Sequence, residues 1–392
     1  MPLPKLRPLD AYPVRVDGRD LVCLRDLEGI VPDPVLLPPR TFLIASLLDG
    51  AADVVDVQAE YARRTGGELL FSWDLQRVID ELDRHGLLLT ERFEERRRAV
   101  IEAYNAAPER PPFHAGKSYP ADPRALVEEL DRHLGAVVPA ELAGVRPRGV
   151  VAPHIDLPRG GWCYAWAHRA LAQDPPETVV VLGVAHGSAP VPFVLTAKPY
   201  ATPLGPVRVD EAAVAFLSDR LDGLLRYEEA HRAEHSIEFQ ALFLRHLYGE
   251  AVRIVPLLCA LPRAAARPPD ETDGLVEVLR AYRGGGRKVA LLASVDFSHV
   301  GPRFGDGEPV DAALAARTSA RDREVLEQVL AGDAEGFWQA VMEDGNRQRI
   351  DAALPVYVLL RVLAPTRGRL LRYGQAPDPA GGLVSFASIV LE

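Results

Sequence analysis

The sequence predicts an α/β protein with a mostly parallel central sheet flanked by helices, preceded by a small α+β unit. Beyond about residue 113, short runs of Val, Leu and Ala alternate with segments whose apolar residues recur at helical spacing. Strands that are apolar throughout and separated by helices are typical of a parallel sheet covered on both faces. A chain of 392 residues is also long enough for two domains.

Residues 1–95 are expected to form the small unit, with a winged-helix-like or adaptor fold. Residues 12–24 alternate apolar and polar side chains around Asp17-Gly18, which indicates a β-hairpin. Helical patterns and one closing strand follow, at 41–48, 54–64, 74–85 and 87–90. The first hundred residues hold 14 Lys and Arg against 18 Asp and Glu, so an interaction or packing role is favoured over DNA binding. A charged helix and a proline-rich stretch, residues 96–112, form the predicted linker.

The main domain is predicted to span residues 113–392. Its strands are expected at 148–152, 178–184, 191–196, 254–259, 288–294 and 384–391. Its helices are expected at 124–134, 162–173, 210–219, 236–248, 272–282, 310–330 and 355–363. In such a sheet, ligands bind in the loops at the carboxyl ends of the parallel strands.

Composition excludes several classes of protein. The net charge of −10 argues against nucleic acid as a partner, because phosphate binding needs clustered Lys and Arg. The apolar runs are too short to span a bilayer, and the N-terminus lacks the apolar stretch of a secretory signal, so a cytoplasmic location is expected. Cys23, Cys163 and Cys259 have no paired spacing, which argues against a disulfide framework and against a cysteine-based zinc site.

Polar motifs follow three of the predicted strands. They are Pro153-His154-Ile155-Asp156, Ala185-His186-Gly187 and Asp296-Phe297-Ser298-His299. Taken singly, each histidine fits a solvated turn as well as a site. Because the carboxyl ends of parallel strands meet at one edge of a sheet, together they favour a metal or acid–base site there.

A fourth polar segment, His231 to Glu238, opens a predicted helix. Its His-x-x-Glu-His pattern, made by His231, Glu234 and His235, matches the inverted zincin motif, in which both histidines bind zinc and the glutamate acts as base. A zinc hydrolase is therefore one alternative. It requires these residues on an uninterrupted helix, remote from His154 and His186.

Five segments, in this order, resemble the Memo-like family, whose bacterial members are often labelled AmmeMemoRadiSam system protein B. They are Phe113–Tyr119, Val151–His154, Leu182–Gly187, Glu234–Glu238 and Ser294–His299. The resemblance covers about residues 110–392 and leaves the N-terminal unit outside. It implies an α/β fold similar to class III extradiol dioxygenases, with a non-haem iron in the active site.

The resemblance also implies a set of metal ligands. It places metal-binding histidines at His154 and His186 and a further pocket histidine at His235. The remaining ligand position, a cysteine in the animal form, falls on Ser298, and a neutral hydroxyl is a poor ligand for iron or copper. His235, Asp296 or His299 can then replace it. A Ser298 nucleophile is disfavoured, because the segment lacks the Gly-x-Ser-x-Gly elbow.

We therefore expect His154, His186 and His235 to bind the metal. The surrounding acid–base and orienting residues are expected to be His231, Glu234, Asp296 and His299. Fe(II) is the expected ion, with Cu or Zn as alternatives, and the expected chemistry is oxidation–reduction in association with a radical SAM system protein. The other alternative is a non-enzymatic pocket for a peptide or anion, in which Arg159 and Arg303 provide positive charge.

Overall fold

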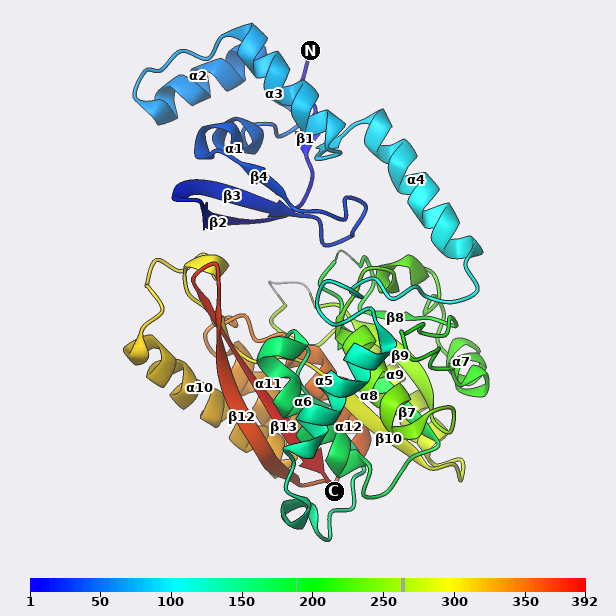
Figure 1. Cartoon of the computed structure of the whole chain (residues 1–392). Helices are drawn as coiled ribbons and strands as arrows, with labels where there is room; N and C mark the ends of the chain where they lie inside the picture. Colours follow the sequence, from blue (N-terminus) through cyan, green and yellow to red (C-terminus); the bar gives the residue numbers. More distant parts are fainter. Residues whose placement is uncertain (188, 262–264) are drawn as a thin grey trace. The chain divides into compact units, whose positions relative to one another are not determined.

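The computed structural model describes residues 1–187, 189–261 and 265–392. The chain divides into two compact units, Met1–Ala107 and Pro108–Glu392 (Figure 1). The boundary falls inside the predicted linker, residues 96–112. Each unit has its own cluster of buried apolar side chains, as independent domains do.

The first unit combines a small sheet with helices. Strands β2 (Asp10–Val16), β3 (Arg19–Arg25) and β4 (Val35–Leu37) pair in that order, all antiparallel. The predicted hairpin turn is confirmed, since Asp17 and Gly18 both adopt positive φ angles, of 49° and 74°. The remaining elements are β1 (Lys5–Leu6), α1 (Pro39–Ser46), α2 (Val54–Thr65), α3 (Ser72–Arg84), β5 (Leu88–Leu89) and α4 (Glu91–Ala106). The likeness to a winged helix stays a prediction.

The second unit is built on an eight-stranded mixed sheet. Its strands are β6 (Gly149–Ala152), β7 (Thr178–Val184), β8 (Phe193–Leu195), β9 (Arg253–Cys259), β10 (Val289–Ser294), β11 (His299–Val300), β12 (Gly368–Asp378) and β13 (Gly382–Leu391). They are ordered β11-β13-β6-β10-β7-β9-β8, and β12 pairs with β13. The four central strands β6, β10, β7 and β9 are parallel to one another.

The sheet is mixed rather than mostly parallel, which corrects the prediction. At one side β12 and β13 form an antiparallel hairpin, and β13 runs antiparallel to β6 and β11. At the other side β8 runs antiparallel to β9. Of these antiparallel pairs, only β12 and β13 are joined by a short turn, and the others link segments far apart in the sequence.

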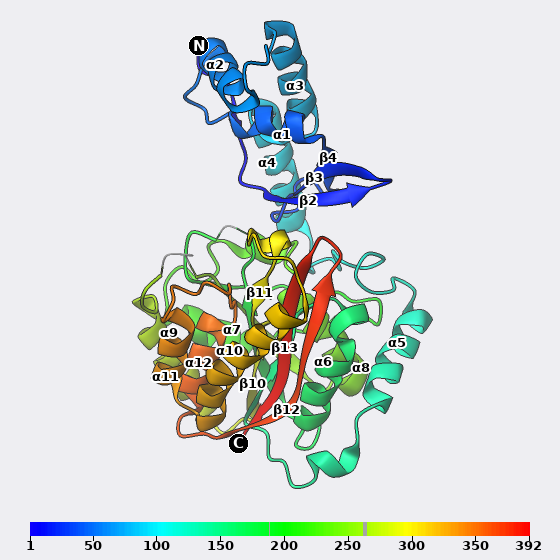
Figure 2. The ribbon, with the colours of Figure 1, turned by 90° about the vertical axis from the view of Figure 1, so that its left-hand side faces the viewer.

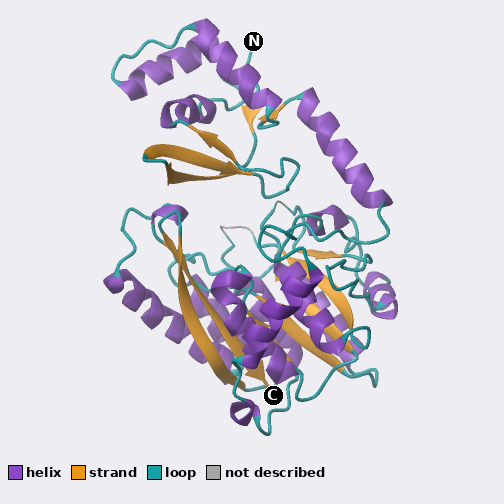
Figure 3. Cartoon of the chain, in the orientation of Figure 1, coloured by secondary structure: helices purple, strands orange, loops and turns teal. Residues whose placement is uncertain are grey.

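Helices cover both faces of this sheet (Figures 2 and 3). They are α5 (Pro123–Gly135), α6 (Leu157–Leu171), α7 (Glu211–Ser218), α8 (Ser236–Tyr248), α9 (Glu271–Arg283), α10 (Ala312–Ala331), α11 (Ala334–Met342) and α12 (Ala353–Leu363). Helix α6 packs on β6 and β13, α8 packs on β7 and β10, and α12 contacts β6, β7 and β10. Within the described ranges, every helix is too short or too polar to span a bilayer.

Strand order determines where the polar motifs meet. Strand β10 lies between β6 and β7, and all three run in the same direction. The loops that follow them therefore emerge side by side at one edge of the sheet, although they are far apart in the sequence.

Candidate metal centre

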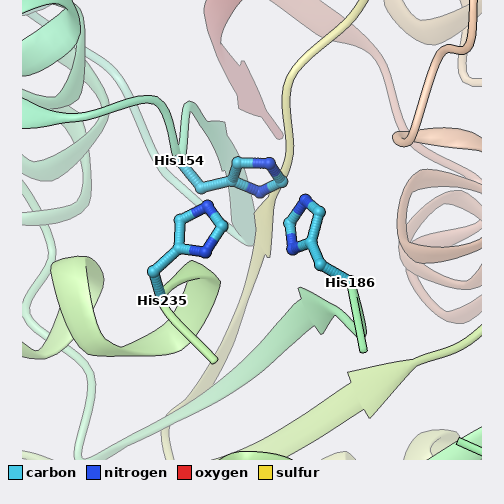
Figure 4. Close-up of side chains that lie close together, drawn as sticks. All are labelled: His154, His186 and His235. Atoms are coloured by element: carbon cyan, nitrogen blue, oxygen red, sulfur yellow. The ribbon is translucent and has the colours of Figure 1, made fainter. Parts of the chain in front are cut away.

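Three histidines from three different segments converge at the carboxyl edge of the sheet (Figure 4). His154 follows β6, His186 follows β7, and His235 immediately precedes α8. One ligand atom of each lies within 4.8 Å of those of the other two. The ring centroids are 4.6 to 5.1 Å apart. His154 is buried, and the other two are partly exposed, so the cluster is open on one side.

The backbone beneath the cluster fixes the ring of His154. Its Nδ1 lies 3.0 Å from the carbonyl oxygen of Ser294, at the end of β10, and therefore donates to it. This bond leaves Nε2 directed into the pocket, as metal ligation requires. The backbone N–H of His154 donates to Asp296 Oδ1 at 3.1 Å.

A single carboxylate, Glu234, orients the other two histidines. Its Oε1 lies 3.0 Å from Nδ1 of His186 and 3.2 Å from Nδ1 of His235. Its Oε2 also accepts the backbone N–H of His186 at 2.9 Å. Because a carboxylate on one ring nitrogen leaves the other free for a metal, the contact of Glu234 with His186 orients that ring as ligands are oriented in metal proteins, and His235 lies at ion-pair distance from the same carboxylate.

Close packing holds the start of α8 against the end of β7. The Ser236 hydroxyl donates to the carbonyl of Val184 at 2.9 Å and accepts its N–H at 3.1 Å. A Cβ on Gly183 would lie only 2.6 Å from Cγ1 of Ile237. The close contact between β7 and α8 at this point therefore requires glycine. His235, one residue before α8, is positioned by this contact.

Buried Arg110 holds the segment before His235 from the other side. Its guanidinium donates to the carbonyls of His231 and Glu234, at 2.9 and 2.7 Å, and pairs with the carboxylate of Glu238. Both side chains of that ion pair are fully buried. The position of Glu234 thus rests on a charged pair in the interior rather than on a mobile loop.

Asp351 also reaches the cluster, and sequence reasoning missed it. Its Oδ2 lies 3.1 Å from Nε2 of His154 and 3.8 Å from Nε2 of both His186 and His299. Asp351 lies between α11 and α12 and follows no strand, so the strand-end rule does not point to it. The only local feature of Asp351 in the sequence is that it is an acidic residue just before an apolar helix. Such a residue usually indicates a helix N-cap and not a ligand site.

Asp296 and His299 border the cluster. Asp296 Oδ2 is 3.7 Å from Nε2 of His154, and the backbone N–H of Asp296 donates to Asp351 Oδ1 at 2.9 Å. Nδ1 of His299 lies 3.0 Å from the carbonyl of Phe297 and 3.1 Å from that of Arg349. His299 therefore carries its proton on Nδ1 and directs Nε2 toward Asp351.

His231 lies outside the pocket. It is fully buried, Nε2 donates to the Val194 carbonyl at 2.9 Å, and Nδ1 accepts from the Tyr200 hydroxyl at 2.7 Å. It ends a short 3-10 helix, Glu228–His231, while α8 begins only at Ser236. The uninterrupted helix of the zinc-hydrolase alternative is not formed. His231 is a structural residue rather than the expected acid–base group.

The hydroxyl of Ser298 forms hydrogen bonds away from the histidine cluster. This fully buried hydroxyl donates to Asp322 Oδ1 at 2.5 Å and lies 2.7 Å from Oε1 of Gln348. Its oxygen is therefore engaged away from the histidines.

Arg159 offers no free charge for the peptide- or anion-binding alternative. Its guanidinium pairs with Asp156 at 2.5 Å and lies 3.4 Å from Asp378. The guanidinium of Arg303 lies 5.2 Å from the ring centre of Phe304.

The carboxylates of the pocket raise the basicity of two histidines. Burial alone would lower the pKa of His154, but Asp351 and Asp296 outweigh burial and raise that pKa to about 9. Burial would likewise lower the pKa of His186, and Glu234 and Asp351 raise it to about 10. Both imidazoles therefore hold a second proton at neutral pH in the metal-free protein.

The charges of the pocket suit a divalent cation. Burial would raise the pKa of Glu234, but His186 and His235 hold it well below the ordinary range. Burial would also raise the pKa of Asp351, which His154 and His186 lower instead. Two carboxylates thus face two protonated imidazoles. A divalent metal that displaces the two protons leaves the net charge unchanged, so the residues fit such an ion.

An α/β sheet with three convergent histidines at the carboxyl ends of its parallel strands defines a candidate metal-binding α/β protein. The family model described as "Memo-like protein" matches residues 110–390. A "MEMO1 family protein" of Aquifex aeolicus is 32% identical over 400 residues, 99% of both chains. A "MEMO1 family protein" of Thermus thermophilus is 34% identical over 81% of this chain and 92% of its own. The chain belongs to the Memo-like family.

The first unit is not shared by all relatives. A "MEMO1 family protein" of Methanopyrus kandleri, 32% identical, matches 72% of this chain and 98% of its own. That relative is therefore about as long as the second unit alone. An uncharacterized protein of known structure, JW3007 from Escherichia coli K12, aligns with 62% of this chain at 16% identity and a TM-score of 0.39. The extradiol-dioxygenase-like architecture stays a prediction.

Proposed function

We propose that this protein binds a redox-active divalent metal, iron(II) in the first place, at His154, His186 and His235, and uses it in dioxygenase-like oxidation–reduction. The observation that carries the proposal is the convergence of three ligand atoms within 4.8 Å. Each of the three rings has its other nitrogen beside a backbone carbonyl or the Glu234 carboxylate. Imidazole nitrogen suits iron, copper and zinc.

When bound, the ion supplies the redox chemistry, and the chain supplies orientation and proton transfer. Glu234 keeps the rings of His186 and His235 turned toward the ion. Nε2 of His299, tied down through Nδ1, faces the same space and accepts a proton from a hydroxyl group of the substrate. The partly exposed side of the cluster admits that substrate, a small molecule or a peptide.

The association with a radical SAM system protein rests on the family resemblance. Co-expression of the two proteins without oxygen, followed by size-exclusion chromatography, tests it. Co-elution supports the association, and separate elution at micromolar concentrations contradicts it.

Anaerobic reconstitution tests the metal site itself. The wild type, His154→Ala and His186→Ala are loaded with Fe(II), Cu or Zn and desalted, and retained metal is measured. We expect each variant to lose about 100-fold or more in affinity, because even the hydrogen-bond partners of ligating histidines are worth 10–100-fold. His85→Ala, an exposed histidine at the end of α3, is the matched control. Equal retention by all four proteins refutes the proposal.

A further inference from the structure

Asp351 places a carboxylate oxygen in the interior beside the histidines. Its Oδ2 is buried and forms no hydrogen bond of normal geometry among the described residues, and the imidazolium Nε2 of His154 lies 3.1 Å away as an ion-pair partner. Its Oδ1, by contrast, accepts the N–H of Asp296 at 2.9 Å. Leaving a buried charged acceptor without a hydrogen bond costs on the order of 1–3 kcal/mol or more. A cation beside Oδ2 removes this cost, and in place of the His154 proton a metal ion can be that cation.

The segment that presents Asp351 is strained. Asn346 and Arg349 both adopt left-handed conformations, with φ of 56° and 54°, which side-chain-bearing residues rarely adopt. Each such residue costs roughly 1 kcal/mol or more, and such strain clusters at functional sites.

This strained segment is nevertheless fastened to the pocket. The N–H of His299 donates to the Gln348 carbonyl at 2.7 Å. Nδ1 of the same ring lies 3.1 Å from the Arg349 carbonyl. These bonds and the one from Asp296 N–H to Asp351 hold the carboxylate against the histidines.

The shortest distance from Oδ2 to a histidine equals a distance between two ligands of one ion. Atoms that bind a common ion at about 2.1 Å lie roughly 3–3.5 Å from one another. Asp351 Oδ2 lies 3.1 Å from Nε2 of His154, within this range, and 3.8 Å from Nε2 of His186, slightly beyond it. Asp296 Oδ2 is farther from His154, at 3.7 Å, and its Oδ1 is used by a backbone N–H.

We infer that Asp351 is a direct ligand of the metal, so that the site combines imidazoles with one carboxylate. This inference rests on the proposed metal function and deepens it. Two histidines and one carboxylate on one side of an ion form the ligand set of non-haem iron(II) oxygenases. Copper(I) prefers thiolate and thioether ligands, so a carboxylate at this position favours iron(II) over copper(I). It also fills the ligand position that Ser298 leaves empty.

The first test compares Asp351→Asn with Asp296→Asn. Each removes one charge near His154, but only the first removes the ligand oxygen, and asparagine at 351 keeps an acceptor for the N–H of Asp296. Fe(II) affinity is measured by chelator competition without oxygen, and folding by thermal unfolding of the metal-free proteins. We expect a loss of about 100-fold or more for Asp351→Asn and a loss of tenfold or less for Asp296→Asn. Equal affinities of the two variants overturn the inference.

A gain-of-signal variant, Asp351→Cys, covers the case in which Asp351→Asn fails to fold. A thiolate that ligates Co(II) adds a sulfur-to-metal charge-transfer band. The wild-type cysteines lie buried and unpaired elsewhere, so the Co(II)-loaded wild type gives the baseline. We expect the band in Asp351→Cys and not in the matched control Asp296→Cys. Absence of the band from Co(II)-loaded Asp351→Cys overturns the inference.

The experiments separate this inference from the proposed function. If the wild type retains neither Fe(II) nor Co(II), the metal function itself fails. If the wild type and Asp351→Asn bind Fe(II) equally, while His154→Ala does not, the metal function stands and the role of Asp351 is refuted.

Discussion

Glu234 is the residue on which the orientation of the pocket most depends. One buried carboxylate faces Nδ1 of both His186 and His235 and also accepts two backbone N–H groups, from His186 and Ser236. Neither ring therefore turns without disturbing the other. The arrangement explains how a partly exposed cluster keeps its ligand atoms directed inward.

The first prediction concerns this carboxylate. Glu234→Gln keeps the shape of the side chain but removes the charge that orients two ligands. We expect Fe(II) affinity to fall about 10–100-fold with the fold retained. Chelator competition and circular dichroism measure the two effects. Glu250→Gln, an exposed change at the end of α8, serves as the control, and unchanged affinity in Glu234→Gln contradicts the role assigned here.

The second prediction concerns acid stability. Burial lowers the pKa of His168 to about 4 and that of His231 to about 3. In the unfolded chain each titrates near 6.5, so below this pH the unfolded state binds protons that the native state does not. Stability therefore decreases as pH falls from 6.5 toward 4, by up to about 1.4 kcal/mol per pH unit for each histidine.

Urea unfolding of metal-free protein between pH 7 and pH 4.5 measures this decrease. His231→Gln is less stable at pH 7, because it disturbs a buried hydrogen-bonded site, but it should lose stability less steeply with acid. Parallel pH profiles of the wild type and His231→Gln would show that His231 is not held neutral in the native state.

The residues of the site were predictable to different degrees. His154 and His186 follow apolar strands, and the rule that ligands gather at strand ends predicted that they would lie close together, as they do. His231 matched a short motif, but Tyr200 and Val194 engage both of its nitrogens, and no local pattern reveals such contacts. Asp351 was missed because a tertiary contact, not its sequence neighbours, brings it to the pocket.

At the scale of elements, the contact between α8 and β7 positions His235. Gly183 permits this contact because any side chain there would collide with Ile237 and Ser236. Strand β7 and helix α8 thus together support two of the three candidate ligands, His186 and His235.

The third prediction tests this support. In Gly183→Ala the new Cβ would lie 2.6 Å from Cγ1 of Ile237 and 2.7 Å from the Ser236 hydroxyl. We expect a loss of about 1–3 kcal/mol in the free energy of unfolding, with weaker Fe(II) binding as α8 shifts. Gly135→Ala, at the end of α5 with no atom within 4 Å of the new Cβ, is the control. Equal stability of the two variants would show that the contact adapts without cost.

Strands with continuous apolar sequence were predicted to within two residues, because both of their faces are buried. Strand β12 was missed, since its residues are mostly half-exposed or exposed and form no apolar run. Helix α11 was also missed, as it is short and close to the end of α10. The mixed character of the sheet was missed because strand positions do not give strand directions: β13 and β8 were both predicted, and both run antiparallel to a neighbour in the sheet.

At the scale of the whole molecule, the chain consists of two units with separate cores. All of the candidate ligands belong to the second unit. The Methanopyrus relative, about as long as this unit alone, indicates that such a domain folds without the first.

The fourth prediction follows from this division. A chain of residues 108–392 should fold cooperatively and keep its Fe(II) affinity within about threefold of that of the full chain, because no candidate ligand is lost. Thermal unfolding and chelator competition measure both properties. A truncated protein that unfolds cooperatively but has lost its iron affinity would show that the first unit contributes to the site.

The place of β13 in the chain has a consequence for biosynthesis. Its ten residues are all buried, and within it Ile389–Leu391 pair with β6, which His154 follows, while Leu383 and Val384 pair with β11, which carries His299. On the ribosome, β13 emerges only after every candidate ligand has been made. A nascent chain without Gly382–Leu391 leaves one side of β6 without its neighbour, so this part of the sheet is completed only after the late strand has docked.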